Sequence, residues 1–197
     1  AQAVREIGHG LMALGFEARH TASILSNTNI EWVLCDLAVL GAGGVSNGIY
    51  PTDAAEQVHY LCEDSGTRVL FVEDDEQLDK ALAVRETLPL LQKIVVFDMD
   101  GLRDFHDPMV ISLKQLQALG REHAQQHPDM LMQRSAACKP EDLAILVYTS
   151  GTTGKPKGGM HSHRGLVYSV RGYNTLIARD ETDECMCFLP LCHIAER

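Results

Sequence analysis

The sequence predicts an α/β fold in which layered, mainly parallel sheets are flanked by helices. Segments with helical periodicity alternate with short apolar segments along the whole chain, which is the pattern of strand–helix–strand units. One short segment, Ala144–Tyr148, is apolar throughout, as expected for a strand of a parallel sheet that is buried on both faces. The apolar fraction is 45%, so the chain can bury a sizeable core.

The first part of the chain is expected to hold three helices and two strands. Val4–Leu14 places its apolar side chains on one helical face, and Ile30–Leu40 has the composition of a largely buried helix that a glycine cluster then interrupts. A third helix is expected to have Thr52 or Asp53 as its cap and to end before Gly66. The strands expected between these helices are Ser23–Ser26 and Val45–Tyr50.

The middle of the chain continues the alternation. Arg68–Val72 and Lys93–Phe97 are rich in the β-branched and aromatic residues that strands favour. Glu73–Thr87 begins with acidic residues, which stabilise the start of a helix through its dipole. Ser112–Gln126 is expected to be a helix capped by its first residue. His127–Pro140 is expected to be a loop because it has prolines near both ends.

The last part of the chain is expected to run from a buried strand through a loop into an amphipathic helix. Ala144–Tyr148 is the strand, and Gly151–Gly159 is the loop. The helix is expected to begin near His163, and its apolar stripe consists of Leu166, Val170, Tyr173 and Ile177. Cys185–Leu189 is expected to be a final strand that ends at Pro190.

The net charge limits the classes of ligand. The formal charge is −10, which excludes a nucleic-acid surface because such a surface needs clustered cations to neutralise phosphates. A single nucleotide is still compatible, since a few backbone N–H groups and one or two local cations can hold its phosphates. Any nucleotide site must therefore be a local positive spot on an acidic protein.

Cysteine content and hydropathy indicate the setting. Six cysteines among 197 residues are too sparse for a disulfide scaffold, so a reduced, cytoplasmic setting is expected. There is no secretory signal pattern, and the most apolar stretch, Trp32–Val45, is shorter than the roughly 20 residues that cross a bilayer. Peripheral association with a membrane and the oligomeric state stay open.

Thr149–Gly158 carries the strongest chemical signal, and we call it the glycine-rich segment. It combines three glycines, four hydroxyl side chains and two lysines directly after the expected buried strand. Glycines allow the backbone to turn sharply and to approach a ligand closely. Hydroxyl groups, exposed N–H groups and lysine charge together form a cradle for phosphates. The alternative is a Gly/Ser/Thr loop with no ligand, which so long a pattern after a strand disfavours.

The glycine-rich segment departs from the Walker A loop of P-loop ATPases. That loop needs a glycine several residues before its Gly-Lys pair and a Ser or Thr after the pair. Here Thr149 stands at the glycine position before Gly154-Lys155, and Pro156 follows the lysine. A P-loop ATPase or kinase, which would release ADP, is therefore disfavoured.

The glycine-rich segment resembles the phosphate-binding signature of the acyl-adenylate-forming superfamily, which includes acyl-CoA synthetases, luciferases and peptide adenylation domains. The resemblance extends along nearly the whole chain. The segments that look like bacterial long-chain fatty-acid–CoA ligases are Ser26–Trp32, Gly48–Thr52, Val69–Glu73 and Leu189–Arg197. In that subgroup a small residue such as Ser or Ala often stands where Cys192 stands here. The implied fold is part of the large N-terminal domain of the adenylate-forming enzymes.

The resemblance implies a ligase that uses ATP, Mg²⁺, CoA and a fatty acid, as in fatty-acid metabolism. A fatty carboxylate attacks the α-phosphorus of ATP to give acyl-AMP and pyrophosphate, and the CoA thiol then displaces AMP. The residues implied to cradle the β- and γ-phosphates are Thr149, Ser150, Gly151, Thr152, Thr153 and Gly154. Lys157 matches the near-constant lysine of the motif and is the implied phosphate-facing cation, whereas Lys155 stands at a variable position and is expected to be solvent-exposed.

His193 is the second catalytic candidate. It matches a family position near the acyl pocket and the α-phosphate, although a lone histidine after a strand is on general grounds more often structural. A zinc cluster of Cys185, Cys187, Cys192 and His193 is disfavoured, because Cys-x-Cys is not a usual zinc pair and no second pair is nearby. The resemblance leaves the magnesium ligands unknown, with Thr149 only a weak candidate.

The chain is expected to be a fragment, residues 1–197 of the large AMP-binding domain. It has no initiator methionine, and its last residues run on from an apolar stretch. The resemblance places the adenine, ribose and main magnesium contacts, and a C-terminal domain with a catalytic lysine, after Arg197. The chain alone is therefore expected to be inactive. A non-catalytic nucleotide-binding or regulatory module, and adenylation of a different carboxylate, stay open as alternatives.

Overall fold

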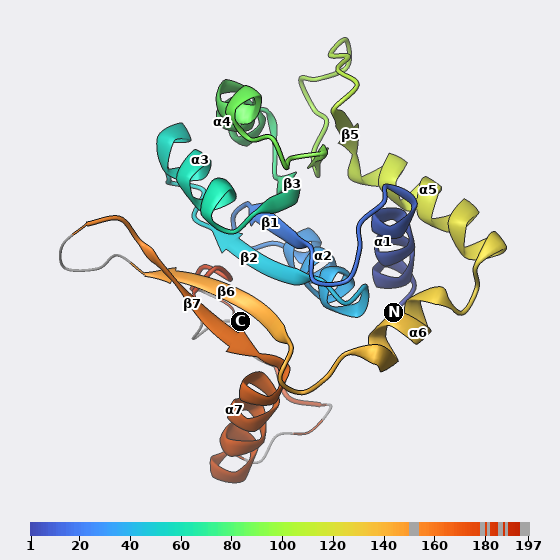
Figure 1. Ribbon diagram of the computed structural model, residues 1–197, viewed down its shortest axis with the longest axis vertical. Coiled ribbons are helices and arrows are strands. Elements are labelled where there is room, and N and C mark those ends of the chain that lie inside the picture. Colours follow the sequence, from blue (N-terminus) through green and yellow to red (C-terminus); the bar gives the residue numbers. More distant parts are fainter. Residues whose placement is uncertain (150–153, 178–179, 181, 185–186, 188, 194–197) are drawn as a thin grey trace.

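A seven-stranded sheet with helices on both faces forms the centre of the computed structural model (Figure 1). The structure describes residues 1–149, 154–177, 180, 182–184, 187 and 189–193. The strands are β1 (Thr21–Leu25), β2 (Val45–Ile49), β3 (Thr67–Val72), β4 (Lys93–Val96), β5 (Val110–Ser112), β6 (Leu143–Thr149) and β7 (Lys157–Ser162). Their order is β5-β4-β3-β1-β2-β6-β7. All neighbours are parallel except β6 and β7, which confirms the mainly parallel α/β fold.

Helices cover both faces of the sheet and create two separate hydrophobic cores. The helices are α1 (Gln2–Ala13), α2 (Ile30–Gly41), α3 (Ala55–Asp64), α4 (Asp75–Val84) with a short 3-10 turn after it (Arg85–Thr87), α5 (Leu113–Gln126), α6 (Met130–Ala137) and α7 (His163–Leu176). Helices α1, α2 and α5 pack on one face, where Trp32 and Phe71 are among the buried side chains. Helices α3 and α4 pack on the other, around residues such as Leu70 and Leu78. Neighbouring residues of one strand, such as Leu70 and Phe71, thus enter opposite cores.

Local capping explains where several helices begin. The Asn29 side chain accepts a hydrogen bond from the Trp32 N–H at the start of α2, and Asp74 does the same for Gln77 at the start of α4. Ser112 and Gln115 form a capping box at the start of α5, which confirms the sequence-based cap. The expected cap of α3 was wrong: its N-cap is Ala54, which makes no side-chain hydrogen bond.

The expected loop at His127–Pro140 was wrong, because it contains α6. A proline just before a helix does not disturb it, since the first helical N–H groups need no intrahelical partner, and Pro128 lies directly before the N-cap Asp129. Leu131 of α6 occupies the space beside Gly8 of α1, where a Cβ would lie 2.8 Å from its Cδ1. The Arg134 guanidinium donates to the Phe16 carbonyl at 2.7 Å. Tertiary contacts therefore hold a helix whose local pattern is weak.

The expected loop at Gly151–Gly159 was too long. Its last three residues belong to β7, which pairs antiparallel with β6 over Lys157–Ser162. Glycine-rich strands have low intrinsic propensity, so the pairing with the buried β6 is what fixes this one. The sequence also missed β5, a three-residue strand at the edge of the sheet.

The expected final strand at Cys185–Leu189 lies partly outside the described residues. Cys187 and Leu189, which are described, belong to no strand. The α7 helix was predicted from His163, and it begins there with Ser162 as its cap. Its expected apolar stripe does not face a core: Leu166 packs partly against Ile145, whereas Val170, Tyr173 and Ile177 are more than half exposed. No helix in the described part of the chain is long and apolar enough to cross a membrane.

Candidate functional site

The β6–β7 hairpin brings Thr149 and Lys157 together. The two residues are directly opposite each other in the strand register, at the end of β6 and the start of β7 (Figure 1). Both are exposed, so the threonine hydroxyl and the lysine ammonium group are available to a ligand. The candidate residues Ser150, Gly151, Thr152 and Thr153, which connect the strands, lie outside the described residues.

Backbone conformation and close contacts explain why two positions of the hairpin are occupied by glycine. Gly154 has φ +110°, a conformation that side-chain-bearing residues rarely adopt. Gly158 lies beneath the Tyr148 ring, and a Cβ there would be 3.1 Å from Cζ of that tyrosine. Gly154 therefore allows the turn, and Gly158 allows Tyr148 to lie flat across the hairpin.

A cavity of about 700 Å³ opens beside the hairpin and contains His193 in its wall. Its walls come from the carboxyl ends of β2 and β6 and from the start of α3, which is where open parallel sheets commonly bind ligands. Thr149 and His193, which are 44 positions apart in the chain, thus face the same space. The residues that line the cavity are Gly48, Tyr50, Thr52, Asp53, Ala54, Gln57, Leu61, Val147, Tyr148, Thr149, Pro156 and His193.

The segment that carries His193 is held against the sheet by close backbone contacts. The Thr28 hydroxyl donates to the Leu189 carbonyl at 3.0 Å, and the His193 N–H donates to the Pro190 carbonyl at 2.8 Å. Gly48 of β2 lies so close to Cys192 that a Cβ would be 2.7 Å from the cysteine Cα. Only glycine permits this approach, so Gly48 sets the position of Cys192 and of the histidine that follows.

The cavity wall also carries two acidic groups with raised pKa values, Asp53 and Tyr50. Burial raises the pKa of the Asp53 carboxyl. A hydrogen bond from the Tyr50 backbone and the charge of Lys80 oppose this shift but do not outweigh it. Burial, with a smaller contribution from Cys192, raises the pKa of the Tyr50 hydroxyl. The Lys80 ammonium group donates to the Pro51 carbonyl at 2.6 Å, so α4 fixes this part of the wall.

Sequence reasoning missed three residues that fix the hairpin to α3. The Tyr60 hydroxyl donates to the Pro156 carbonyl at 2.9 Å, and the Tyr148 hydroxyl donates to Asp64 Oδ2 at 2.6 Å. Burial, and then the Asp64 carboxylate, raise the pKa of the Tyr148 hydroxyl. These contacts join residues more than 80 positions apart, so no local pattern reveals them. The only sequence signal was two tyrosines on elements that an α/β fold can place side by side.

The described residues contain no group of three or more His, Cys, Asp or Glu side chains that could hold a metal ion. Of the four residues weighed for zinc, Cys185 lies outside the described part of the chain. Cys192 is buried beside Gly48, and Cys187 is exposed. Thr149 contributes one exposed hydroxyl at the hairpin.

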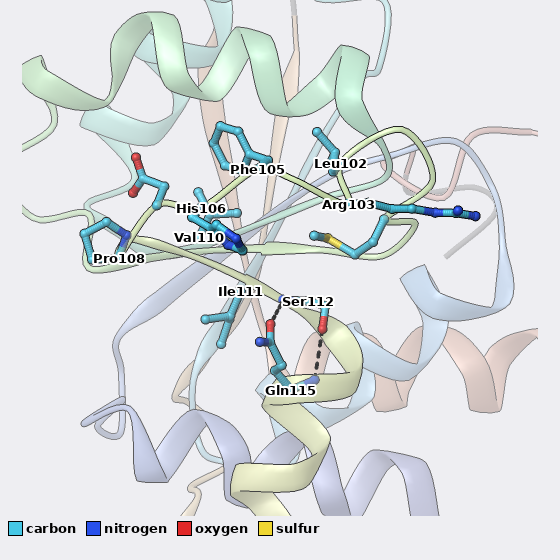
Figure 2. Close-up of a pocket in the computed structure, with 11 residues that line it drawn as sticks. Leu102, Arg103, Phe105, His106, Pro108, Val110, Ile111, Ser112 and Gln115 are labelled. Atoms are coloured by element: carbon cyan, nitrogen blue, oxygen red, sulfur yellow. Dashed lines mark hydrogen bonds between the residues drawn. The ribbon is translucent and has the colours of Figure 1, made fainter.

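A second cavity, of about 640 Å³, lies at the other edge of the sheet, beside β5 (Figure 2). Leu102, Phe105 and Val110 form its apolar wall, and Ser112 and Gln115 are hydrogen-bonded to each other at its rim as the capping box of α5. None of the residues predicted for the site lines this cavity. The candidate site is therefore the hairpin and its own cavity.

A comparison with models of protein families shows to which family the chain belongs. The family model described as AMP-binding enzyme matches residues 1–197. The chain belongs to the AMP-binding enzyme family.

Relatives of this AMP-binding chain include long-chain-fatty-acid–CoA ligases. The chain is 34% identical to ACSBG2 of Xenopus laevis over 190 residues, which are 94% of this chain and 25% of that protein. It is 34% identical to FadD15 of Mycobacterium bovis over an alignment of 201 positions that covers 100% of this chain and 31% of that protein. The chain thus spans about a quarter to a third of the length of these relatives.

The fold of this AMP-binding chain matches solved structures of related enzymes. The anthranilate CoA ligase AuaEII, solved in complex with anthranoyl-AMP, superposes with a TM-score of 0.72 at 25% identity, over 86% of this chain and 30% of that one. The expected likeness to the N-terminal domain of adenylate-forming enzymes is therefore confirmed at the level of the fold.

Proposed function

We propose that this chain is part of the large AMP-binding domain of a long-chain fatty-acid–CoA ligase. The observation that carries the proposal is the pairing of Thr149 with Lys157 across the hairpin, next to a cavity that His193 also lines. Relatives named as long-chain-fatty-acid–CoA ligases, at 34% identity over nearly the whole chain, support the substrate class.

The first step forms a bond between a fatty carboxylate oxygen and the α-phosphorus of ATP. The bond from that phosphorus to the bridging oxygen breaks, and pyrophosphate leaves. Negative charge develops on the phosphates, so the step depends on positioned donors and cations rather than on a covalent nucleophile. Lys157 and the hydroxyl and N–H groups of the glycine-rich segment supply these donors in our proposal.

The second step transfers the acyl group to CoA. The thiol sulfur attacks the acyl carbonyl carbon and loses its proton to solvent, the bond from that carbon to the adenylate oxygen breaks, and AMP leaves. His193 shapes the cavity near the carboxylate in this proposal, because it shares that cavity with Thr149 at the end of β6. Two groups of the cavity wall, Asp53 and Tyr50, have pKa values that burial raises, so burial favours the uncharged form of each.

Magnesium offsets phosphate charge when it is bound in this class of reaction. The described residues fit such an ion poorly, because they offer the exposed Thr149 hydroxyl but no cluster of carboxylates. On the family resemblance, we propose that the carboxylate ligands of the metal, together with the adenine and ribose contacts, belong to parts of the full-length protein outside residues 1–197. The same parts would include the C-terminal domain.

A cytoplasmic setting belongs to the proposal as well. Among the described cysteines, Cys35, Cys62 and Cys138 are free thiols. Free thiols are usual in a reducing compartment. Peripheral contact with a membrane would suit a fatty substrate, and sedimentation with vesicles would test it.

Fatty-acid-dependent exchange between ATP and labelled pyrophosphate tests the proposed function. We expect exchange by the full-length protein to rise from acetate to oleate. Lys157→Ala should lower it about tenfold or more, because a charge-assisted contact to phosphate is lost. Lys114→Ala, at an exposed position on α5, is the matched control and should leave the rate unchanged. Residues 1–197 alone should give no exchange.

The possible results separate the alternatives. Exchange with aromatic rather than fatty acids would favour adenylation of a different carboxylate, which the similarity to an anthranilate CoA ligase makes worth including. No exchange with any carboxylate by folded full-length protein would contradict adenylation and leave a nucleotide-binding module. Release of ADP in place of AMP would point to an ATPase.

A further inference from the structure

Helix α3 contacts the glycine-rich segment near its end and contacts the residue directly before its start. Near the end of the segment, the Tyr60 hydroxyl donates to the carbonyl of Pro156, the residue directly before Lys157. Directly before the segment, the hydroxyl of Tyr148 donates a hydrogen bond to Asp64; Tyr148 is the residue that precedes Thr149. Both predicted phosphate ligands of the hairpin therefore follow a residue that α3 holds.

The spacing of the two α3 residues explains how one helix reaches both strands. Tyr60 and Asp64 are four positions apart, so they project from the same face of α3. The strands β6 and β7 are paired there, with Tyr148 opposite Gly158. Because Gly158 has no side chain, the Tyr148 ring can cover it and still reach Asp64.

Lys155 adds a third contact to this arrangement. Its Nζ lies 4.8 Å from the centroid of the Tyr60 ring, within the range of a cation–π interaction. The side chain is exposed, as the sequence predicted, but its charge is directed to α3. Tyr60 thus contacts both residues that precede Lys157, one through its ring and one through its hydroxyl.

We propose that α3 holds the two strands of the hairpin in place for ligand binding, with Tyr60 as a positioning residue for Lys157. We call the contacts of Tyr60 with Pro156 and of Asp64 with Tyr148 the clamp. This inference rests on the proposed function for the identity of the ligand, ATP. A loop rich in glycine loses much conformational freedom when it is ordered around a phosphate. Contacts that restrict it beforehand reduce this loss and so strengthen binding. Tyr60 touches no substrate in this account and acts only through the segment that it holds.

Tyr60→Phe in the full-length protein is the test, because it removes the hydroxyl and keeps the ring. We expect backbone amides of 155–159 to exchange with deuterium faster in the absence of ligand. We also expect the Kd for a non-hydrolysable ATP analogue to rise by about threefold to tenfold, the range that loss of one neutral hydrogen bond spans. The KM for the fatty acid should not change. Tyr173→Phe, at an exposed tyrosine of α7, is the matched control.

A pair of variants at Asp64 tests the other end of the clamp. Asp64→Asn keeps an acceptor for the Tyr148 hydroxyl and should behave like the wild-type protein. Asp64→Ala removes the acceptor and should reproduce the effects of Tyr60→Phe on amide exchange and on the Kd for the ATP analogue. Rescue by asparagine separates a positioning contact from a general loss of stability.

The outcomes distinguish the clamp from the proposed function. Unchanged amide exchange in Tyr60→Phe, or faster exchange with an unchanged Kd, overturns the positioning role. Absence of ATP–pyrophosphate exchange in the wild-type protein overturns the ligase function instead. The clamp is then still judged by amide exchange and by binding of the ATP analogue, since neither measurement needs turnover.

Discussion

Glycines at the contact between α1 and α5 show how single residues determine the packing of this fold. A Cβ at Gly120 of α5 would lie 1.8 Å from the Glu6 carbonyl oxygen, and one at Gly10 of α1 would lie 2.4 Å from the Leu116 carbonyl oxygen. Both obstacles are backbone atoms, which cannot move aside as a side chain can. The two helices therefore approach closely only because each has a glycine opposite the backbone of the other.

Gly120→Ala should consequently destabilise the protein. We expect the free energy of unfolding to fall by about 1–3 kcal/mol or more, since overpacking forces the helices apart. Gly172→Ala is the matched control, because its Cβ would meet nothing within 4 Å on the helix α7. It should be neutral or stabilise by about 0.5–1 kcal/mol through its better helix propensity. Urea denaturation of both variants checks this, and equal midpoints would contradict the packing argument.

Residue types alone predicted some of the site and missed the rest. The chemistry of the glycine-rich segment singled out Thr149 and Lys157, which the hairpin places opposite each other. The roles of these residues and of His193 stay predictions. Tyr60 and Asp64 carry no distinctive local pattern, and their importance follows only from the approach of α3 to the hairpin.

At the scale of elements, the sequence predicted what local physics controls. The strands of the parallel sheet have dense apolar runs, and the capping serine of α5 lies where expected. The errors fall where contacts between distant segments dominate. The helix α6 depends on Leu131 beside Gly8, and β7 depends on its ladder with β6. The cap of α3 was wrong because Thr52 and Asp53 line the cavity before the helix begins.

The site cavity does not lie at the first place where the topology of the sheet predicts a ligand. Doubly wound sheets often bind ligands where the strand order reverses, which here is between β1 and β3. There Glu73 Oε2 accepts hydrogen bonds from the Asn27 N–H and side-chain amide at 2.7 and 2.9 Å. These contacts join the segments that follow β1 and β3, and the site cavity is lined by the ends of β2 and β6.

The interface between α1 and α5 should also make stability depend on pH. His9 Nδ1 and His123 Nδ1 are 3.0 Å apart, so one ring must donate and the other accept. Burial lowers the pKa of both imidazoles. The pKa of His9 is lowered further by the charges of His123, Arg5 and His127. The pKa of His123 is lowered further by the charges of His127 and Arg134. The unfolded state therefore binds more protons, and stability should be lost as pH falls below about 6.5.

Chemical denaturation at several pH values checks this dependence. We expect the denaturant concentration at the unfolding midpoint of the wild-type protein to decrease as the pH is lowered from about 7.5 to about 5.5. His123→Gln should weaken the dependence, because only one imidazole then remains at the contact. His106→Gln, at the distant β5 cavity, should keep the wild-type slope. Equal slopes in all three proteins would rule out the histidine pair as the source.

At the scale of the whole molecule, the acidic chain concentrates its candidate chemistry at one end of the sheet. The net charge is −10, yet the hairpin presents two lysines beside a cavity of about 700 Å³. The apolar face of α7 is exposed beyond the other end of β7, where Tyr173 and the C-cap residue Ile177 are more than half accessible. The AMP-binding family model covers residues 1–197, and in our proposal the chain supplies the phosphate-binding side of a larger site.

The reaction that we propose begins with the attack of a fatty carboxylate on the α-phosphorus of ATP. The most direct test uses a fatty acid with both carboxylate oxygens labelled by ¹⁸O, with the full-length protein, ATP and CoA. Attack on the α-phosphorus followed by thioester formation moves one labelled oxygen from the acid into AMP, which mass spectrometry detects. We predict AMP that carries one ¹⁸O. Label in inorganic phosphate or in ADP, with unlabelled AMP, would contradict the account.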